Sequence, residues 1–146
     1  MESEYFRGRV GHIVSVNPAK CRATVEFKDK DRMVSAELQL GFTATLGRQV
    51  ARTLKPGTHV VCEFLGNGYE TGFVKYAIYD EKNPPPTDDP NKDVLTYEDG
   101  TWIEYDHKEH KLLIRAVKDV EISAGGDIVI AADGNFVLVG SPINLN

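Results

Sequence analysis

Cysteines, histidines and long apolar runs are scarce in this sequence of 146 residues. Its two cysteines, Cys21 and Cys62, lack the Cys-x-x-Cys spacing of zinc and redox sites, and we expect two reduced, buried thiols. No apolar run reaches the roughly 18 residues of a membrane-spanning helix. The N-terminus also lacks the apolar segment of a signal peptide. We therefore expect neither a disulfide scaffold, nor a spanning helix, nor a secreted precursor.

Residue patterns of catalytic sites are also missing. His107 and His110 are the only histidines close in sequence, and they fall on a predicted turn without a third ligand. No helix follows Gly125, Gly126 or Gly134, which disfavours a phosphate-binding loop. We therefore expect no enzymatic activity, no cofactor and no metal site. The net charge of −5 disfavours nucleic acid as a partner.

A repeat of eight residues fills the last part of the chain. Residues 119–126, 127–134 and 135–142 read DVEISAGG, DIVIAADG and NFVLVGSP, and the closing INLN slips the frame by one. Each unit opens with Asp or Asn, is apolar at its second and fourth positions, and closes on turn-forming residues. This alternation predicts a short strand with one buried face in every unit. Residues 111–118 fit the same frame, and the apolar positions together are Leu112, Ile114, Val120, Ile122, Ile128, Ile130, Phe136 and Leu138.

Eight residues are too few to enclose a core, because one coil of a single-chain solenoid takes roughly 20 residues or more. Three chains that each contribute one unit supply about 24 residues per turn. We therefore predict an intertwined trimeric β-helix, a triangular prism with these eight side chains on its axis as the trimer core. A monomer would leave the apolar row open to water. The alternative is an ordinary meander in a small β domain.

The first half of the chain has the alternating pattern of β-strands. Residues 40–55 are less regular and have room for a short helical turn at residues 46–53. Five strands with this irregular segment between the third and fourth fit an all-β Greek-key barrel of the OB type. The predicted strands are residues 7–16, 20–27, 32–38, 59–65 and 69–79.

Four prolines within residues 83–91 predict a stiff, extended linker. After it, Asp99-Gly100 predicts a two-residue hairpin turn. Trp102 either covers the junction of the two parts or belongs to a half-buried sheet face. The predicted organisation is an OB-fold domain at residues 1–83, a linker at 84–93, a hairpin and stalk base at 94–118, and a trimeric β-helix at 119–146.

A barrel of this type leaves a second function open, which is a trimeric OB-fold module that binds nucleic acid or saccharide. Tyr5, Phe6 and Phe27 are candidates for stacking on bases. Acidic residues are interleaved with the basic residues of this region, and they weaken its attraction for the phosphates of a nucleic acid. The basic residues are Arg7, Arg9, Lys20, Arg22, Lys28, Lys30 and Arg32.

Residues 54–86, LKPGTHVVCEFLGNGYETGFVKYAIYDEKNPPP, resemble the end of the OB domain in the contractile-tail spike family. That family includes phage baseplate assembly protein V and the spikes of type VI secretion systems and R-type bacteriocins. The glycine-rich octads are similar to the trimeric β-helix of the same family. The elements that carry the resemblance are a Pro-Gly turn at residues 56–57, the strand with Val60 and Val61, the glycine hairpin at 66–68, the strand ending at Tyr76 to Tyr79, and Asn83 with the prolines that follow.

The resemblance implies a homotrimeric, non-enzymatic central spike at the baseplate hub, which sheath contraction drives through the target cell envelope. It also implies hub proteins as partners of the OB domain and transient contact with the target membrane. Such a protein is assembled in the bacterial cytoplasm and carried in the baseplate of a virion or injection particle. The histidine-rich metal-bound apex and the lysozyme-like domain of some members have no counterpart in this sequence.

The outer face of the octads loses polarity toward the C-terminus, since the third positions run Glu121, Val129, Val137. We therefore expect the blunt end to dock a separate tip protein, such as a small PAAR-type cone. Direct contact of this apolar end with lipid is the alternative. The expected docking residues are Val137, Val139, Pro142, Ile143 and Leu145.

Overall fold

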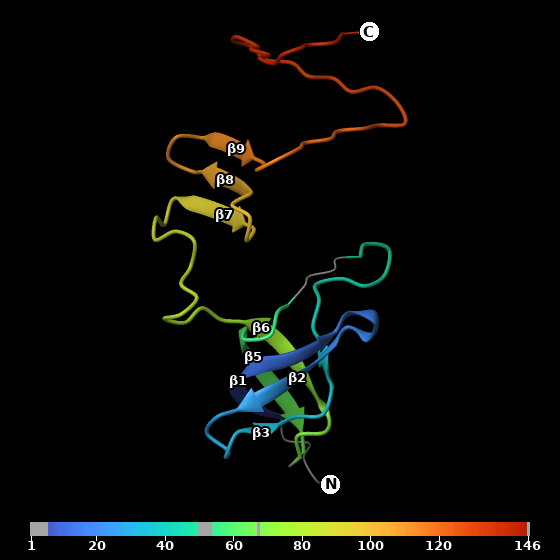
Figure 1. Ribbon diagram of the computed structural model, residues 1–146, viewed down its shortest axis with the longest axis vertical. Helices are drawn as coiled ribbons and strands as arrows, with labels where there is room; N and C mark the ends of the chain where they lie inside the picture. The colour runs from blue at the N-terminus through green and yellow to red at the C-terminus, as the bar shows by residue number, and fades with distance from the viewer. Residues whose placement is uncertain (1–5, 50–53, 67, 146) are drawn as a thin grey trace. The chain divides into compact units, whose positions relative to one another are not determined.

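The computed structural model describes residues 6–49, 54–66 and 68–145 of the chain, which divides into two compact units, Met1–Pro85 and Pro86–Asn146 (Figure 1). The described residues hold β-strands and one short 3-10 turn, Pro18–Lys20, and no helix among them is long and apolar enough to cross a membrane. The strands of the first unit are β1 (Phe6–Asn17), β2 (Arg22–Phe27), β3 (Met33–Val34), β4 (Leu38–Leu40), β5 (His59–Leu65) and β6 (Gly72–Ala77), and those of the second are β7 (Lys92–Thr96), β8 (Trp102–Asp106) and β9 (Lys111–Arg115).

Five strands of the first unit close into a barrel. The long strand β1 pairs antiparallel with β2 on one side and with β5 on the other. β5 also pairs antiparallel with β6. β4 completes the ring, because it pairs in parallel with β6 and antiparallel with β2. β3 only extends the edge of β2. The protein is thus all-β, and its closed five-stranded barrel is consistent with the OB type that the strand order predicts.

Alternate side chains of the strands point inward and fill the barrel. Every second residue of β2 and β5 is buried, as a strand with one face toward a core requires. Phe27 packs edge to face on Phe64 with ring centroids 5.6 Å apart, and Tyr69 covers both rings. The buried apolar side chains are Ile13, Ala23, Val25, Phe27, Leu38, Val60, Cys62, Phe64 and Val74.

The strand predicted at residues 32–38 forms as two short strands, because Ser35 interrupts it. The Ser35 backbone N–H donates to the Val25 carbonyl at 2.9 Å, and the Ser35 hydroxyl oxygen accepts from the Val25 N–H at 3.0 Å. The same hydroxyl donates to the Ala36 carbonyl at 2.7 Å. A side chain therefore takes the place of a backbone acceptor, and the ladder restarts at β4.

The predicted helical turn at residues 46–53 is only partly described. Residues 46–48 form a bend rather than a helix. Residues 50–53 lie outside the described ranges, as does Asn67 of the predicted glycine hairpin.

The second unit contains a three-stranded antiparallel sheet, β7-β8-β9. Its first hairpin has a three-residue loop, residues 98–100, rather than the predicted two-residue turn, since the Tyr97 N–H donates to the Thr101 carbonyl at 2.9 Å. Gly100 takes the left-handed conformation, φ 91°, that such a loop needs. Trp102 is half-buried on a sheet face and donates its indole N–H to Glu104 Oε2 at 3.0 Å.

Close approach of β1 to β2 requires a glycine at position 11. A Cβ at Gly11 would lie 2.6 Å from the carbonyl oxygen of Glu26 and 2.6 Å from a methyl carbon of Val25, whereas a Cβ at Gly8 of the same strand would meet nothing within 4 Å. A backbone oxygen cannot move aside as a flexible side chain can. The barrel closes around this position only when no side chain is present.

We expect Gly11→Ala to destabilise the barrel by about 1–3 kcal/mol, the usual cost of overpacking a core. Thermal unfolding followed by circular dichroism should show a transition that is on the order of 5–20 °C lower. Gly8→Ala is the matched control and should unfold close to the wild-type temperature. Equal losses in the two variants would contradict the close-packing explanation.

Candidate functional site

The second unit has no buried core in a single chain. None of the described residues 86–145 is buried, and every described residue from 117 onward is exposed. The β7-β8-β9 sheet also carries an apolar row across one face, formed by the cross-strand partners Leu95, Ile103 and Ile114. Leu95 and Ile114 of this row are 51% and 61% exposed, and Ile103 is partly buried.

The octads appear in the structure as a regular series of bends. From residue 116 the described chain forms no strand, and Figure 1 shows it as a thread without arrows. Bends fall at residues 117–118, 125–126, 133–134 and 141–142, which is a spacing of eight residues. The bends coincide with the turn-forming ends of the repeat. Within the described part of this chain, the octads form no strand pairs with one another.

The predicted trimer-core residues are all exposed in the isolated chain, at 52–72% for Leu112, Ile114 and the six apolar octad positions. The predicted outward valines Val129, Val137 and Val139 are more exposed, at 74–89%. Every predicted inward position is thus less exposed than each of these three valines. Of the predicted tip-docking residues, Leu145 is 85% and Ile143 45% exposed, and Pro142 is exposed as well.

The histidines singled out by the sequence do not come together as a ligand pair. His107 places Nε2 2.9 Å from Asp93 Oδ2 on β7, and its ring stands edge-on to Tyr105. His110 ends the same turn in a left-handed conformation, φ 53°. Asp106 organises this turn by accepting backbone N–H groups from Lys108 and Glu109. The segment is therefore a hydrogen-bonded turn.

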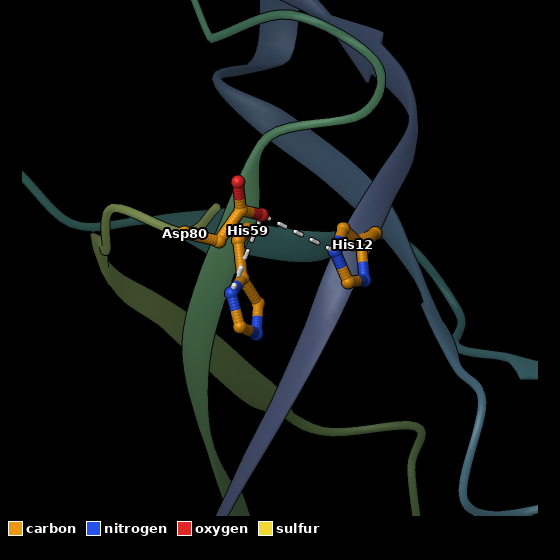
Figure 2. A group of neighbouring side chains, drawn as sticks. All are labelled: His12, His59 and Asp80. Carbon is orange, nitrogen blue, oxygen red and sulfur yellow. Dashed lines mark ion pairs between the residues drawn. The ribbon is translucent and has the colours of Figure 1, made fainter. Parts of the chain in front are cut away.

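A different group of side chains converges on the first unit. His12 of β1 and His59 of β5 are cross-strand partners, and their rings stack with centroids 4.5 Å apart and planes 3° from parallel. Asp80, which follows β6, places Oδ2 3.7 Å from His12 Nε2 and 3.7 Å from His59 Nδ1. Figure 2 shows both rings presenting a nitrogen to this carboxylate. The ligand atoms lie within 4.8 Å of one another, the one such grouping of three among the described residues.

Sequence reasoning missed this cluster because its members are far apart in the chain. Only the antiparallel pairing of β1 with β5 brings His12 opposite His59. The available signal was the strand order of an OB-type barrel, in which the first and fourth main strands are neighbours. Combined with the position of each histidine in its strand, that order would have indicated a cross-strand pair.

The charges of the cluster favour a neutral imidazole beside an ionised carboxylate. The pKa of His12 is lowered from its ordinary value by burial and by the neighbouring His59 and Lys28, while Asp80 acts in the opposite direction. The pKa of Asp80 is lowered chiefly by the backbone N–H of Asn83. At neutral pH His12 therefore keeps the free lone pair with which an imidazole binds metals.

The residues considered for stacking on nucleic acid bases do not form such a surface in the described structure. Phe27 is fully buried in the barrel core, so the expectation that it is available for stacking is wrong. Arg9 pairs with Asp29 at 2.7 Å and Arg32 with Glu26 at 2.9 Å. Tyr5 and the Phe6 side chain lie outside what the structure describes.

The sequence matches no protein-family model, and no curated protein matches it significantly.

The two thiols differ in environment. Cys62 is buried in the barrel as predicted, and burial raises the pKa of its thiol to about 12 from the ordinary 9.0. Cys21 is exposed, which corrects the expectation that it is buried. It follows the 3-10 turn in a left-handed conformation, φ 50°, and its thiol donates to the Pro18 carbonyl at 3.7 Å.

We expect iodoacetamide at pH 8 to alkylate Cys21 and to spare Cys62 in the folded protein. A thiol whose pKa is raised stays protonated at this pH, and burial also blocks the reagent. Peptide mass spectrometry should find Cys62 modified only after denaturation. Modification of both thiols at the same rate would contradict the buried position of Cys62.

Proposed function

We propose that this protein is the homotrimeric central spike of a contractile injection system or phage tail, with no catalytic role of its own. The observation that carries the proposal is the second unit, which has apolar side chains at alternate positions, bends every eight residues, and no buried residue among 86–145. Such a segment becomes stable only when other chains cover it, because a few unpacked strands are marginal in water.

Three copies fit this segment better than two. Each octad supplies one short strand per turn, and three strands form a triangular section that encloses one layer of side chains. The apolar positions of successive octads then stack along the axis, and the bends form the corners of the prism. In the same arrangement, the β7-β8-β9 sheet lies at the end of the prism where the octads begin. Its apolar row of Leu95, Ile103 and Ile114 would cover that end of the apolar column.

The barrel offers a surface for hub proteins. On the outer side of β1, β5 and β6, cross-strand neighbours Val10, Val61 and Tyr76 form an apolar row, in which Val10 is 50% and Tyr76 57% exposed. Apolar side chains in register on an exposed sheet face are typical of protein contacts. In the proposed spike this barrel belongs to the baseplate, and the octads point toward the target membrane.

The C-terminal end of the proposed prism is suited to a separate tip protein. Val137, Val139 and Leu145 lie at the end of the chain and are strongly exposed. They remain on the outer or terminal surface even when the inward positions pack on the axis. A partner with a complementary apolar base, such as a PAAR-type cone, would cover them.

Ile128→Asp should abolish the trimer, because it places three unpaired carboxylates in the apolar axis, at a cost of several kcal/mol. Val129→Asp is the matched control, since it puts the same charge on the neighbouring outward position. Size-exclusion chromatography with light scattering should find trimers for the wild type and for Val129→Asp, and smaller species for Ile128→Asp. A trimeric Ile128→Asp protein would refute the inward register, and a monomeric wild type would overturn the spike itself.

A spike should have no appreciable affinity for single-stranded DNA, because it carries net negative charge and its stacking candidate Phe27 is buried. Titration of labelled oligonucleotides at low and high salt measures this directly. Saturable binding that weakens steeply with salt would favour the OB-fold binding module instead.

A further inference from the structure

Backbone pairing fixes the positions of His12 and His59. These residues are the last pair of the β1–β5 ladder. Just beyond them, the Ile13 N–H donates to the Thr58 carbonyl at 2.9 Å, and the Ile78 N–H donates to the His59 carbonyl at 2.9 Å. The start of β5 and the end of β6 therefore meet β1 at the histidine pair, and the ladder holds the backbone of both histidines in place.

Asp80 is oriented independently of the histidines. Its Oδ1 atom accepts the backbone N–H groups of Lys82 at 3.0 Å and Asn83 at 2.8 Å, while the Asp80 N–H donates to the Asn83 carbonyl at 3.2 Å. This turn engages one carboxylate oxygen and leaves Oδ2 directed at the two rings (Figure 2). The carboxylate is thus held in place before any ligand arrives.

Hydrogen bonds within the cluster do not account for this arrangement. At 3.7 Å, Oδ2 is too far from either ring nitrogen for a hydrogen bond. The Nδ1 atom of His59 is buried and has no hydrogen-bond partner. A buried polar atom without a partner is uncommon, and a water molecule or an ion can satisfy it.

We propose that His12, His59 and Asp80 bind one divalent transition-metal ion, of which Zn²⁺ is the representative. Two imidazoles and one carboxylate are a ligand set that such ions accept. Ligand atoms around tetrahedral Zn²⁺, at about 2.0–2.1 Å from the ion, lie about 3.3 Å apart. Both rings would have to turn about their side-chain bonds out of the stacked arrangement, because the lone pair of an imidazole lies in its ring plane and two parallel planes cannot both contain one ion. This turn would also have to bring the ligand atoms, which lie within 4.8 Å of one another, to that separation. The ion would supply the partner that His59 Nδ1 lacks.

A bound ion would join three separate parts of the first unit. It would tie β1 and β5 to the segment after β6, immediately before Asn83 and the proline-rich linker. Three protein ligands leave a fourth position for water or another donor. The site is complete within one chain, so it does not depend on the trimer or on the spike.

Isothermal titration of the full-length protein with ZnCl₂ tests the proposal. The wild type should bind one Zn²⁺ per chain, and His12→Ala, His59→Ala and Asp80→Asn should each weaken that binding by on the order of tenfold or more. Zn²⁺ should also raise the thermal unfolding temperature of the wild type, because it binds only the folded state. Asp80→Asn should lose this rise, and since the amide oxygen can still accept the turn hydrogen bonds, this variant should keep the barrel.

Two controls separate this site from other possible donors. His107→Ala removes a histidine that is already paired with Asp93, and Cys21→Ser removes the exposed thiol. Both variants should bind Zn²⁺ with wild-type affinity and stoichiometry. The proposal is overturned if the wild type shows no saturable binding. It is also overturned if binding persists unchanged in His12→Ala and Asp80→Asn, or disappears in either control.

Discussion

Burial of apolar side chains separates the two units of this chain and determines what each can do. In the barrel, five strands form a closed ring, so alternate side chains such as Phe27 and Phe64 leave water completely. After Pro86 a similar alternation continues along the chain, and no described residue there is buried. Leaving apolar surface exposed to water costs about 25 cal/mol of free energy per Å². Unpaired strands also leave backbone N–H and C=O groups without partners in a sheet. Assembly of several copies would remove both costs, which is why the proposed function depends on the second unit.

The parts of the fold that depend on local pattern could be predicted from the sequence. Period-two alternation located the main barrel strands, and their order pointed to the closed all-β barrel that the structure contains. The eight-residue repeat is evident in the amino-acid sequence, and the structure has bends at the same spacing. Local signals failed where one side chain competes with the backbone. Ser35 splits the expected third strand because its hydroxyl takes the Val25 N–H, and hydroxyl rotation is not encoded in a hydrophobic pattern.

The candidate metal cluster could not be predicted in this way, because it depends on which strands become neighbours and in which register. A shift of one residue between β1 and β5 would move His12 away from His59 and turn it toward the opposite face of the sheet. The complete burial of Phe27 has the same origin. An alternating pattern shows that one face of a strand is buried, but closure of the barrel decides how completely. The cluster of residues that are distant in sequence could therefore be found only from the structure, whereas the eight-residue repeat could be found from the sequence.

In the proposed prism, the regular spacing of the bends would restrict how this chain can change in length. Bends at residues 117–118, 125–126, 133–134 and 141–142 divide the segment into equal steps. Removing or adding a whole step leaves all remaining apolar positions in phase. Removing one residue exchanges the inner and outer faces of everything beyond it, because side chains of an extended strand alternate with a period of two. The proposed spike could therefore be lengthened or shortened only in steps of eight residues.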